Sequence, residues 1–136
     1  MVHDLIASKI ESLQRCLDRI VLKRPASLAD FENDIDVQDI VVLNLERAIQ
    51  LSVDMAMVIL SEENAPVPAT MAEAFEELAR RNIISEDLSV RMKKATGFRN
   101  LVVHAYHTID WAIVWSIIND RLDEFRQFSK AVYTWK

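Results

Sequence analysis

The sequence predicts an all-α protein, a compact bundle of about five helices that forms one domain over residues 1–136. Apolar residues make up 51% of the chain, which is enough for a substantial core and excludes disorder. The chain contains one glycine and three prolines, whereas a sheet protein of this size needs many such residues in its turns. Long stretches repeat apolar side chains every three or four residues, as helices with one buried face do.

The first two helices are predicted from their apolar stripes and from the breaks that follow them. The first helix spans residues 2–23, and Pro25 with Ser27 marks its end. Residues 31–36 are predicted to be a connection in which Asp34 or Asp36 caps the second helix. That helix runs from about residue 37 to residue 60 and ends before two prolines, which lack the backbone N–H that a helix needs.

Three further helices complete the predicted bundle. One spans about 70–81, and the next begins at Ser85 and ends at the only glycine, Gly97. The last begins near Thr108 or Asp110 and continues to about residue 132. Its first turns, over Trp111–Ile118, are apolar almost all round, so we expect part of this surface to meet a second subunit. The sequence therefore predicts a homodimer.

The bulk properties exclude several classes of protein. A single cysteine cannot form an intramolecular disulfide, leaves no thiol cluster for zinc, and indicates a reducing cytoplasm. The start of the chain lacks the features of a signal peptide, and the longest apolar run is about half of what spans a bilayer, so we expect no membrane contact. The net charge of −5 argues against a surface that coats nucleic acid generally, but it leaves room for a local basic cleft. Three histidines without a suitable carboxylate predict no metal site, and one glycine predicts no phosphate-binding loop.

The segment 97–110 concentrates the polar residues that are suited to chemistry. Arg99 is a permanent cation whose planar fork fits phosphate oxygens, and His104 can exchange a proton near neutral pH. Tyr106 supplies a hydroxyl that can donate a hydrogen bond or accept a chemical group. On an unbroken helix Arg99 and His104 would diverge by about 140°, so convergence of all three side chains on one substrate requires a helix break inside the segment or a cleft to which a second subunit supplies part of the wall.

This segment resembles the R-x4-H-x-Y signature of HepT-like HEPN proteins, with Arg99, His104 and Tyr106 at the signature positions. The resemblance covers roughly residues 37–125 and is sharpest over 97–118. R-x4-H alone arises by chance in many chains, so the flanking residues provide the specificity. These matching residues are Arg99-Asn100, Val103-His104, Ile109-Asp110 and Val114-Trp115, with Pro68, Phe75, Leu78 and Gly97-Phe98 further upstream.

The resemblance implies a HEPN four-helix up-and-down core and a homodimeric, metal-independent endoribonuclease, the toxin of a type VII-like toxin–antitoxin pair. In such a protein His104 would be the general base on a ribose 2′-OH, Arg99 would clamp the phosphate, and Asn100 would support the site by hydrogen bonding. Tyr106 would position the RNA, a tRNA or an mRNA. It is also the residue to which a cognate minimal nucleotidyltransferase antitoxin would transfer AMP to silence the toxin. No cofactor is implied.

Several alternatives stay open at this point. The trio can be structural, with Arg99 paired to Glu86 or Asp110, His104 at a helix end and Tyr106 in the core. A HEPN domain can also be a non-catalytic module that binds a nucleotide or a partner and acts with a nucleotidyltransferase. Asp54 is a candidate partner of a motif side chain, and His107 is a candidate surface residue. The cations upstream of the motif are either a track for RNA phosphates or a solvated face; they are Arg80, Arg81, Arg91, Lys93 and Lys94.

Overall fold

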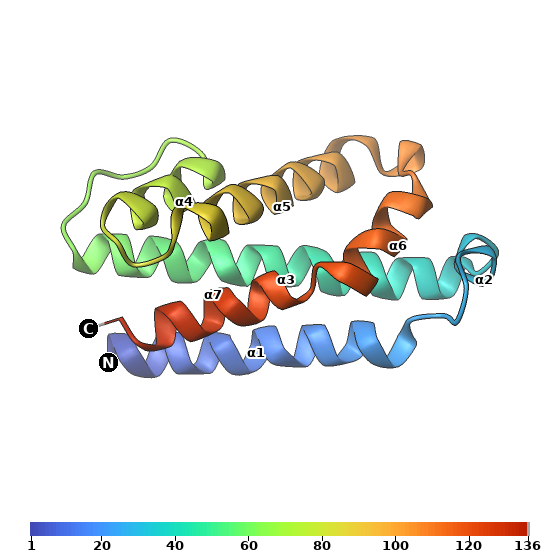
Figure 1. Cartoon of the computed structure of the whole chain (residues 1–136), viewed down its shortest axis with the longest axis horizontal. Coiled ribbons are helices and arrows are strands. Elements are labelled where there is room, and N and C mark those ends of the chain that lie inside the picture. The colour runs from blue at the N-terminus through green and yellow to red at the C-terminus, as the bar shows by residue number, and fades with distance from the viewer. Residues whose placement is uncertain (136) are drawn as a thin grey trace.

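The chain forms an up-and-down arrangement of long helices (Figure 1). The computed structural model describes residues 1–135. The three longest helices, α1 (Val2–Lys23), α3 (Ile35–Glu62) and α5 (Glu86–Ala105), lie along the long axis of the molecule. Helix α7 (Asp123–Tyr133) contacts all three and completes the core. No strand occurs within residues 1–135, and the predicted all-α class and four-helix up-and-down core are confirmed.

Shorter helices connect the long ones. Helix α2 (Leu28–Glu32) replaces part of the connection that the sequence predicted over 31–36, because Ser27 caps it and Phe31 is fully buried. Helix α4 (Met71–Arg80) packs against α3 and α5. A single 3₁₀ turn, η1 (Tyr106–Thr108), leads into α6 (Trp111–Asp120), which packs against α2.

Side-chain caps define where several helices begin. The Asp34, Ser85 and Asp110 side chains each accept a hydrogen bond from a backbone N–H in the first turn of α3, α5 and α6, so these three predicted helix starts are confirmed. Thr70 caps α4 in the same way. Each cap satisfies a donor that has no partner inside the helix and contributes about 1 kcal/mol.

Two predicted helix boundaries are wrong. Helix α5 does not end at Gly97 but continues to Ala105, since an exposed glycine inside a helix is tolerated when the rest of the helix is packed. The predicted last helix is broken at Arg121, which separates α6 from α7. Asn119 and Asp120 are poor helix formers, and the buried Glu124 carboxylate accepts a hydrogen bond from Arg121 Nε at 2.9 Å, which stabilises the corner.

The core is built from the apolar stripes that the sequence predicted. Phe75 of α4 and Phe128 of α7 are fully buried and meet edge to face, with ring centroids 5.5 Å apart. The stripe of α7 stays continuous with that of α6 across the break, because Ile118 and Phe125 are buried on either side of it. Within residues 1–135, no helix combines the length and apolar character that a membrane span requires.

Candidate functional site

The motif residues lie at the end of α5 and in the 3₁₀ turn that follows. Arg99, Asn100 and His104 belong to the second half of α5, and Tyr106 is the first residue of η1. Asn100 and His104 are exposed, whereas Arg99 is half-buried. The Nε atom of Arg99 is fully buried and has no hydrogen-bond partner within the described chain. The cation that the sequence assigned to phosphate binding therefore retains unused donor capacity.

Arg99 and His104 leave α5 from different sides of the helix. The two residues are five positions apart on an unbroken helix, so their side chains diverge by about 140°. The helix break that the sequence offered as one route to convergence is present inside the segment, but it follows His104: α5 ends at Ala105 and η1 begins at Tyr106, so Arg99 and His104 stay on one helix. The other route that the sequence offered is a wall supplied by a second subunit.

Tyr106 is tied to α3 by a hydrogen bond that the sequence did not predict. Its hydroxyl donates to Asp39 Oδ1 at 2.5 Å, and its ring lies edge-on to Trp111 with centroids 6.2 Å apart. Burial, and after it the hydrogen bond and negative charge of Asp39, raises the pKa of Tyr106 to about 12. Asp39 is one of several acidic residues near the start of α3, so nothing in the local sequence distinguishes it.

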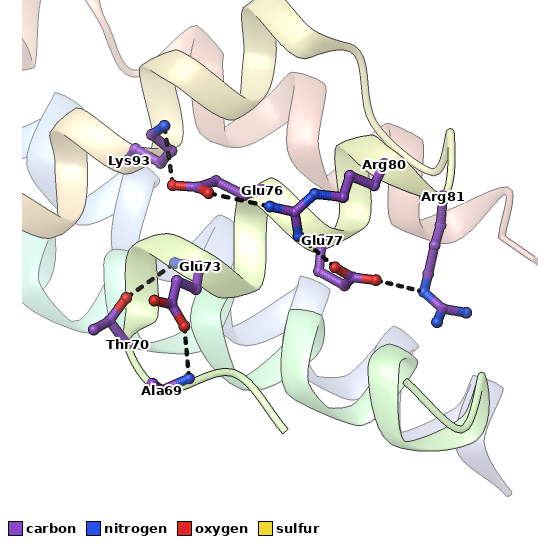
Figure 2. Close-up of polar contacts among 8 residues, drawn as sticks. All are labelled: Ala69, Thr70, Glu73, Glu76, Glu77, Arg80, Arg81 and Lys93. Atoms are coloured by element: carbon purple, nitrogen blue, oxygen red, sulfur yellow. Dashed lines mark hydrogen bonds and ion pairs between the residues drawn. The ribbon is translucent and has the colours of Figure 1, made fainter. Parts of the chain in front are cut away.

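The cations upstream of the motif are mostly occupied by carboxylates (Figure 2). Lys93 Nζ lies 3.2 Å from Glu76, which also pairs with Arg80 at 3.6 Å. Arg80 and Arg81 both pair with Glu77, and these hydrogen bonds lower the pKa of its carboxyl. Arg91 of α5 pairs with Asp87, which lies one turn earlier in the same helix. This network favours the solvated-face interpretation over a track for RNA phosphates.

The structure also tests the alternatives for single residues. Among the described residues, no carboxylate lies within ion-pair distance of Arg99, so neither Glu86 nor Asp110 pairs with it. Asp54 does not bond a motif side chain: it accepts a hydrogen bond from Gln50 at 2.8 Å and pairs with Lys9 at 3.7 Å. His107 is exposed in the 3₁₀ turn, as the sequence predicted. Residues 1–135 contain no group of three or more His, Cys, Asp or Glu side chains arranged to hold a metal ion.

Apolar side chains are exposed on the elements that hold and follow the motif. Val103 of α5 is 52% exposed and Ile113 of α6 is 55% exposed, and Leu101 is also exposed. Large aliphatic groups left in water beside a polar site are typical of a surface that another protein covers.

Comparison with known proteins identifies close relatives along almost the whole chain. The family model described as "Ribonuclease HepT-like" matches residues 6–132. An mRNA nuclease HepT of Shewanella oneidensis is 33% identical over 127 residues, which cover 93% of this chain and 95% of that protein. A tRNA nuclease HepT of Aphanizomenon flos-aquae is 27% identical over 128 residues, covering 94% and 87% of the two chains.

A solved structure extends the likeness to three dimensions. The tri-AMPylated Shewanella oneidensis HEPN toxin, in complex with an MNT antitoxin, superposes with a TM-score of 0.89 at 32% identity. The match covers 95% of this chain and 96% of that one. The resemblance inferred from the motif is therefore confirmed by both sequence and structure.

Proposed function

The chain belongs to the HepT-like ribonuclease family, and from that premise we propose that it is a metal-independent endoribonuclease toxin, one domain over residues 1–136, neutralised by a nucleotidyltransferase antitoxin. The observation that supports this most directly is the complete set of Arg99, Asn100, His104 and Tyr106 at the end of α5. Its named relatives are nucleases of mRNA and tRNA, and a HEPN toxin of similar structure forms a complex with an MNT antitoxin. RNA is accordingly the proposed substrate, and a cytoplasmic location fits that role.

The proposed reaction is transesterification at an RNA phosphodiester. His104 removes the proton from a ribose 2′-OH, and the 2′ oxygen attacks the adjacent phosphorus while the bond to the 5′ oxygen breaks. The leaving 5′ oxygen takes up a proton, and the product ends in a 2′,3′-cyclic phosphate. Arg99 stabilises the extra negative charge on the phosphorane, and Asn100 supports the site by hydrogen bonding. This chemistry needs no metal ion.

We propose that the active form is a homodimer in which each subunit supplies part of the cleft. The angular separation of about 140° between Arg99 and His104 on α5 supports this, because a second subunit facing the helix would complete a cleft around a phosphodiester that both residues contact. The exposed apolar side chains of Leu101, Val103 and Ile113 supply a surface that such a contact would bury.

Control is proposed to act through Tyr106. In AMP transfer from ATP, Tyr106 Oη forms a bond to the α-phosphorus, the bond to the β-phosphate oxygen breaks, and pyrophosphate leaves. The hydroxyl proton passes to Asp39 Oδ1, which already accepts the hydrogen bond of this hydroxyl. The product has no hydroxyl to donate to Asp39, and it places a phosphate charge beside that carboxylate. Modification therefore blocks the RNA path by bulk and charge without unfolding the protein.

A cleavage assay in EDTA tests the catalytic assignment. The purified chain should cleave RNA after chelation and leave a 2′,3′-cyclic phosphate, whereas His104→Ala and Arg99→Ala should each lose at least about 10²-fold in rate. His107→Ala, an exposed histidine three residues from His104, is the matched control and should retain activity. Unchanged cleavage by both motif variants would refute the site. RNA or antitoxin binding without any cleavage would instead establish the non-catalytic module.

Mass spectrometry after co-expression with the cognate nucleotidyltransferase tests the switch. The chain should gain the mass of one or more AMP groups on Tyr106 and lose cleavage activity. Tyr106→Phe should fold and escape the antitoxin, while Tyr133→Phe, which removes the other tyrosine, should still be modified. An adduct elsewhere, or neutralisation without any adduct, would rule out Tyr106 as the switch.

A further inference from the structure

A groove of about 620 Å³ runs between α1 and α3. Its walls are largely apolar and include Cys16 of α1 together with Ile40, Leu43 and Leu51 of α3. Leu43 is 44% exposed, so part of this apolar wall is in contact with water. The volume falls within the range of about 300–1,000 Å³ that is common for sites of small organic ligands, and one nucleotide is a ligand of that size.

Three arginines line the groove: Arg15 and Arg19 on α1 and Arg47 on α3. All three are exposed, and among the described residues no carboxylate lies within ion-pair distance of any of them. Arg15 makes one hydrogen bond, from Nη2 to Ser12 Oγ of its own helix at 3.2 Å. Arg47 and Arg15 both oppose the rise that burial causes in the pKa of Cys16, so their charges lie close to the apolar wall.

The cations near α4 differ from these arginines. Arg80, Arg81 and Lys93 are paired with glutamates, which leaves little positive charge for a ligand (Figure 2). The acidic residue in the α1–α3 groove, Asp54, is itself paired with Lys9 at 3.7 Å. The arginine side of the groove therefore remains positive in a protein whose net charge is −5. An anionic ligand is the chemistry that complements it.

The groove leads toward the motif along one side of α3. Asp39, Leu43 and Arg47 follow one another at intervals of four residues, so they lie on adjoining turns of the same side of the helix. Leu43 and Arg47 line the groove, and Asp39 accepts the hydrogen bond from Tyr106. The eight residues from Asp39 to Arg47 correspond to about 12 Å along the axis, a distance that a few nucleotides can span.

We propose that the α1–α3 groove is a second RNA-binding subsite, which holds single-stranded RNA flanking the nucleotide at the motif. The Arg15, Arg19 and Arg47 guanidinium groups bind backbone phosphates, and bases pack against Leu43 and Leu51. Identification of the ligand as RNA rests on the proposed function. Contacts to phosphates fix the register of a strand without reading its sequence, so the groove contributes affinity and positioning.

Fluorescence anisotropy with a uniformly 2′-O-methyl single-stranded RNA tests this subsite. The probe lacks the 2′-OH nucleophile, so its binding is measured without cleavage and independently of the catalytic assignment. The test variant is R15Q/R47Q, and the control is R126Q/K130Q, which removes the same charge from exposed positions of α7. We expect the test variant to weaken binding at least about 10-fold and to reduce the slope of log K against log salt by about 1.4, or 0.7 for each lost phosphate contact. The control should change both quantities far less.

Equal loss of binding in the two double variants would overturn the proposal, because it would show a general charge effect. Conversion of a wild-type dimer to a monomer by R15Q/R47Q would also overturn it, since the groove would then be a subunit contact. Failure of the proposed function gives a different result. If R15Q/R47Q weakens RNA binding but the Arg99→Ala and His104→Ala variants still cleave RNA, the subsite is retained and the catalytic site is rejected. Thermal unfolding monitored by circular dichroism verifies that both variants fold.

Discussion

Replacing Asp39 by asparagine tests whether its carboxylate raises the pKa of Tyr106. The two side chains join α3 to the 3₁₀ turn through a hydrogen bond of 2.5 Å, between residues 67 positions apart. Asparagine keeps the size of the side chain and a hydrogen-bond acceptor but removes the charge. We therefore expect the pKa of Tyr106 to fall from about 12 while remaining above 10.0, because burial is the largest cause of the rise and is unchanged.

The expected change in the pKa of Tyr106 depends on how far Tyr106 and Asp39 are exposed to water. The full rise, from 10.0 to about 12, is roughly two pKa units, which would correspond to almost 3 kcal/mol without screening by water. Tyr106 is 39% exposed and Asp39 is also exposed, so the contribution of the carboxylate is reduced to on the order of 1 kcal/mol. We expect the Asp39→Asn substitution to lower the pKa of Tyr106 by roughly half a unit to one unit.

The difference between the pKa of Tyr106 in the folded protein and in the unfolded chain makes the free energy of unfolding depend on pH in the alkaline range. The folded protein holds the Tyr106 proton up to about pH 12, whereas the unfolded chain releases it near pH 10. Between these values the unfolded state binds fewer protons, so the free energy of unfolding decreases as the pH rises. The contribution of Tyr106 is complete below pH 10, and it is lost as the pH rises toward 12. Asp39→Asn should make this decrease smaller.

The titration is best measured on chains in which Tyr106 is the only tyrosine. Tyr133→Phe achieves this, because the sequence contains two tyrosines, and Tyr133 is exposed at the end of α7. Carbon-13 NMR of labelled tyrosine, in Tyr133→Phe with and without Asp39→Asn, gives the two pKa values directly. Urea unfolding at increasing pH measures the linked stability. Identical pKa values in the two chains would refute the reasoning, since the carboxylate would then have no influence on the hydroxyl.

Three further predictions concern assembly and the fold. Ile113→Asp should convert the expected dimer to a monomer in light scattering, because it places a charge on an exposed apolar surface; an unchanged dimer would locate the interface elsewhere. Asp110→Ala should lower the free energy of unfolding by about 1 kcal/mol through loss of the α6 cap, and an unchanged urea midpoint would show that the cap does not contribute. Phe128→Ala should cost about 3–5 kcal/mol, since it leaves a cavity against Phe75; a cost similar to that of Asp110→Ala would mean that the core refills the space.

Local sequence determined that the fold is all-α, which side chains form its buried stripes, and where several of its helices begin. The buried stripes of α1, α3 and α7 follow the three-and-four spacing, and the caps of α3, α5 and α6 are Asp34, Ser85 and Asp110, each of which was a candidate at that helix start. Both signals act over one or two helical turns, so they can be read without knowing what the helix packs against. The motif was identified in the same way, because its residues are close together in the chain.

Helix ends depended on tertiary contacts. Gly97 was expected to end a helix, but Phe98 and Val102 are buried beyond it, and their packing holds the helix to Ala105. The predicted last helix has an unbroken apolar stripe, and the corner at Arg121 keeps that stripe buried on both sides. At Gly97 the packing of distant elements outweighs a local preference of about 1 kcal/mol, whereas at Arg121 the burial of the stripe and the poor helix formers before it act in the same direction.

The polar partners of the candidate site were also determined by the tertiary structure. Asp39 meets Tyr106, and Arg15 faces Arg47 across the groove, because α3 packs between α1 and α5. The members of each pair are separated by tens of residues, so no spacing in the sequence relates them. The sequence by itself determined which side chains are available for chemistry. Only the packed helices decided which of them lie together, since that depends on contacts between residues remote in the chain.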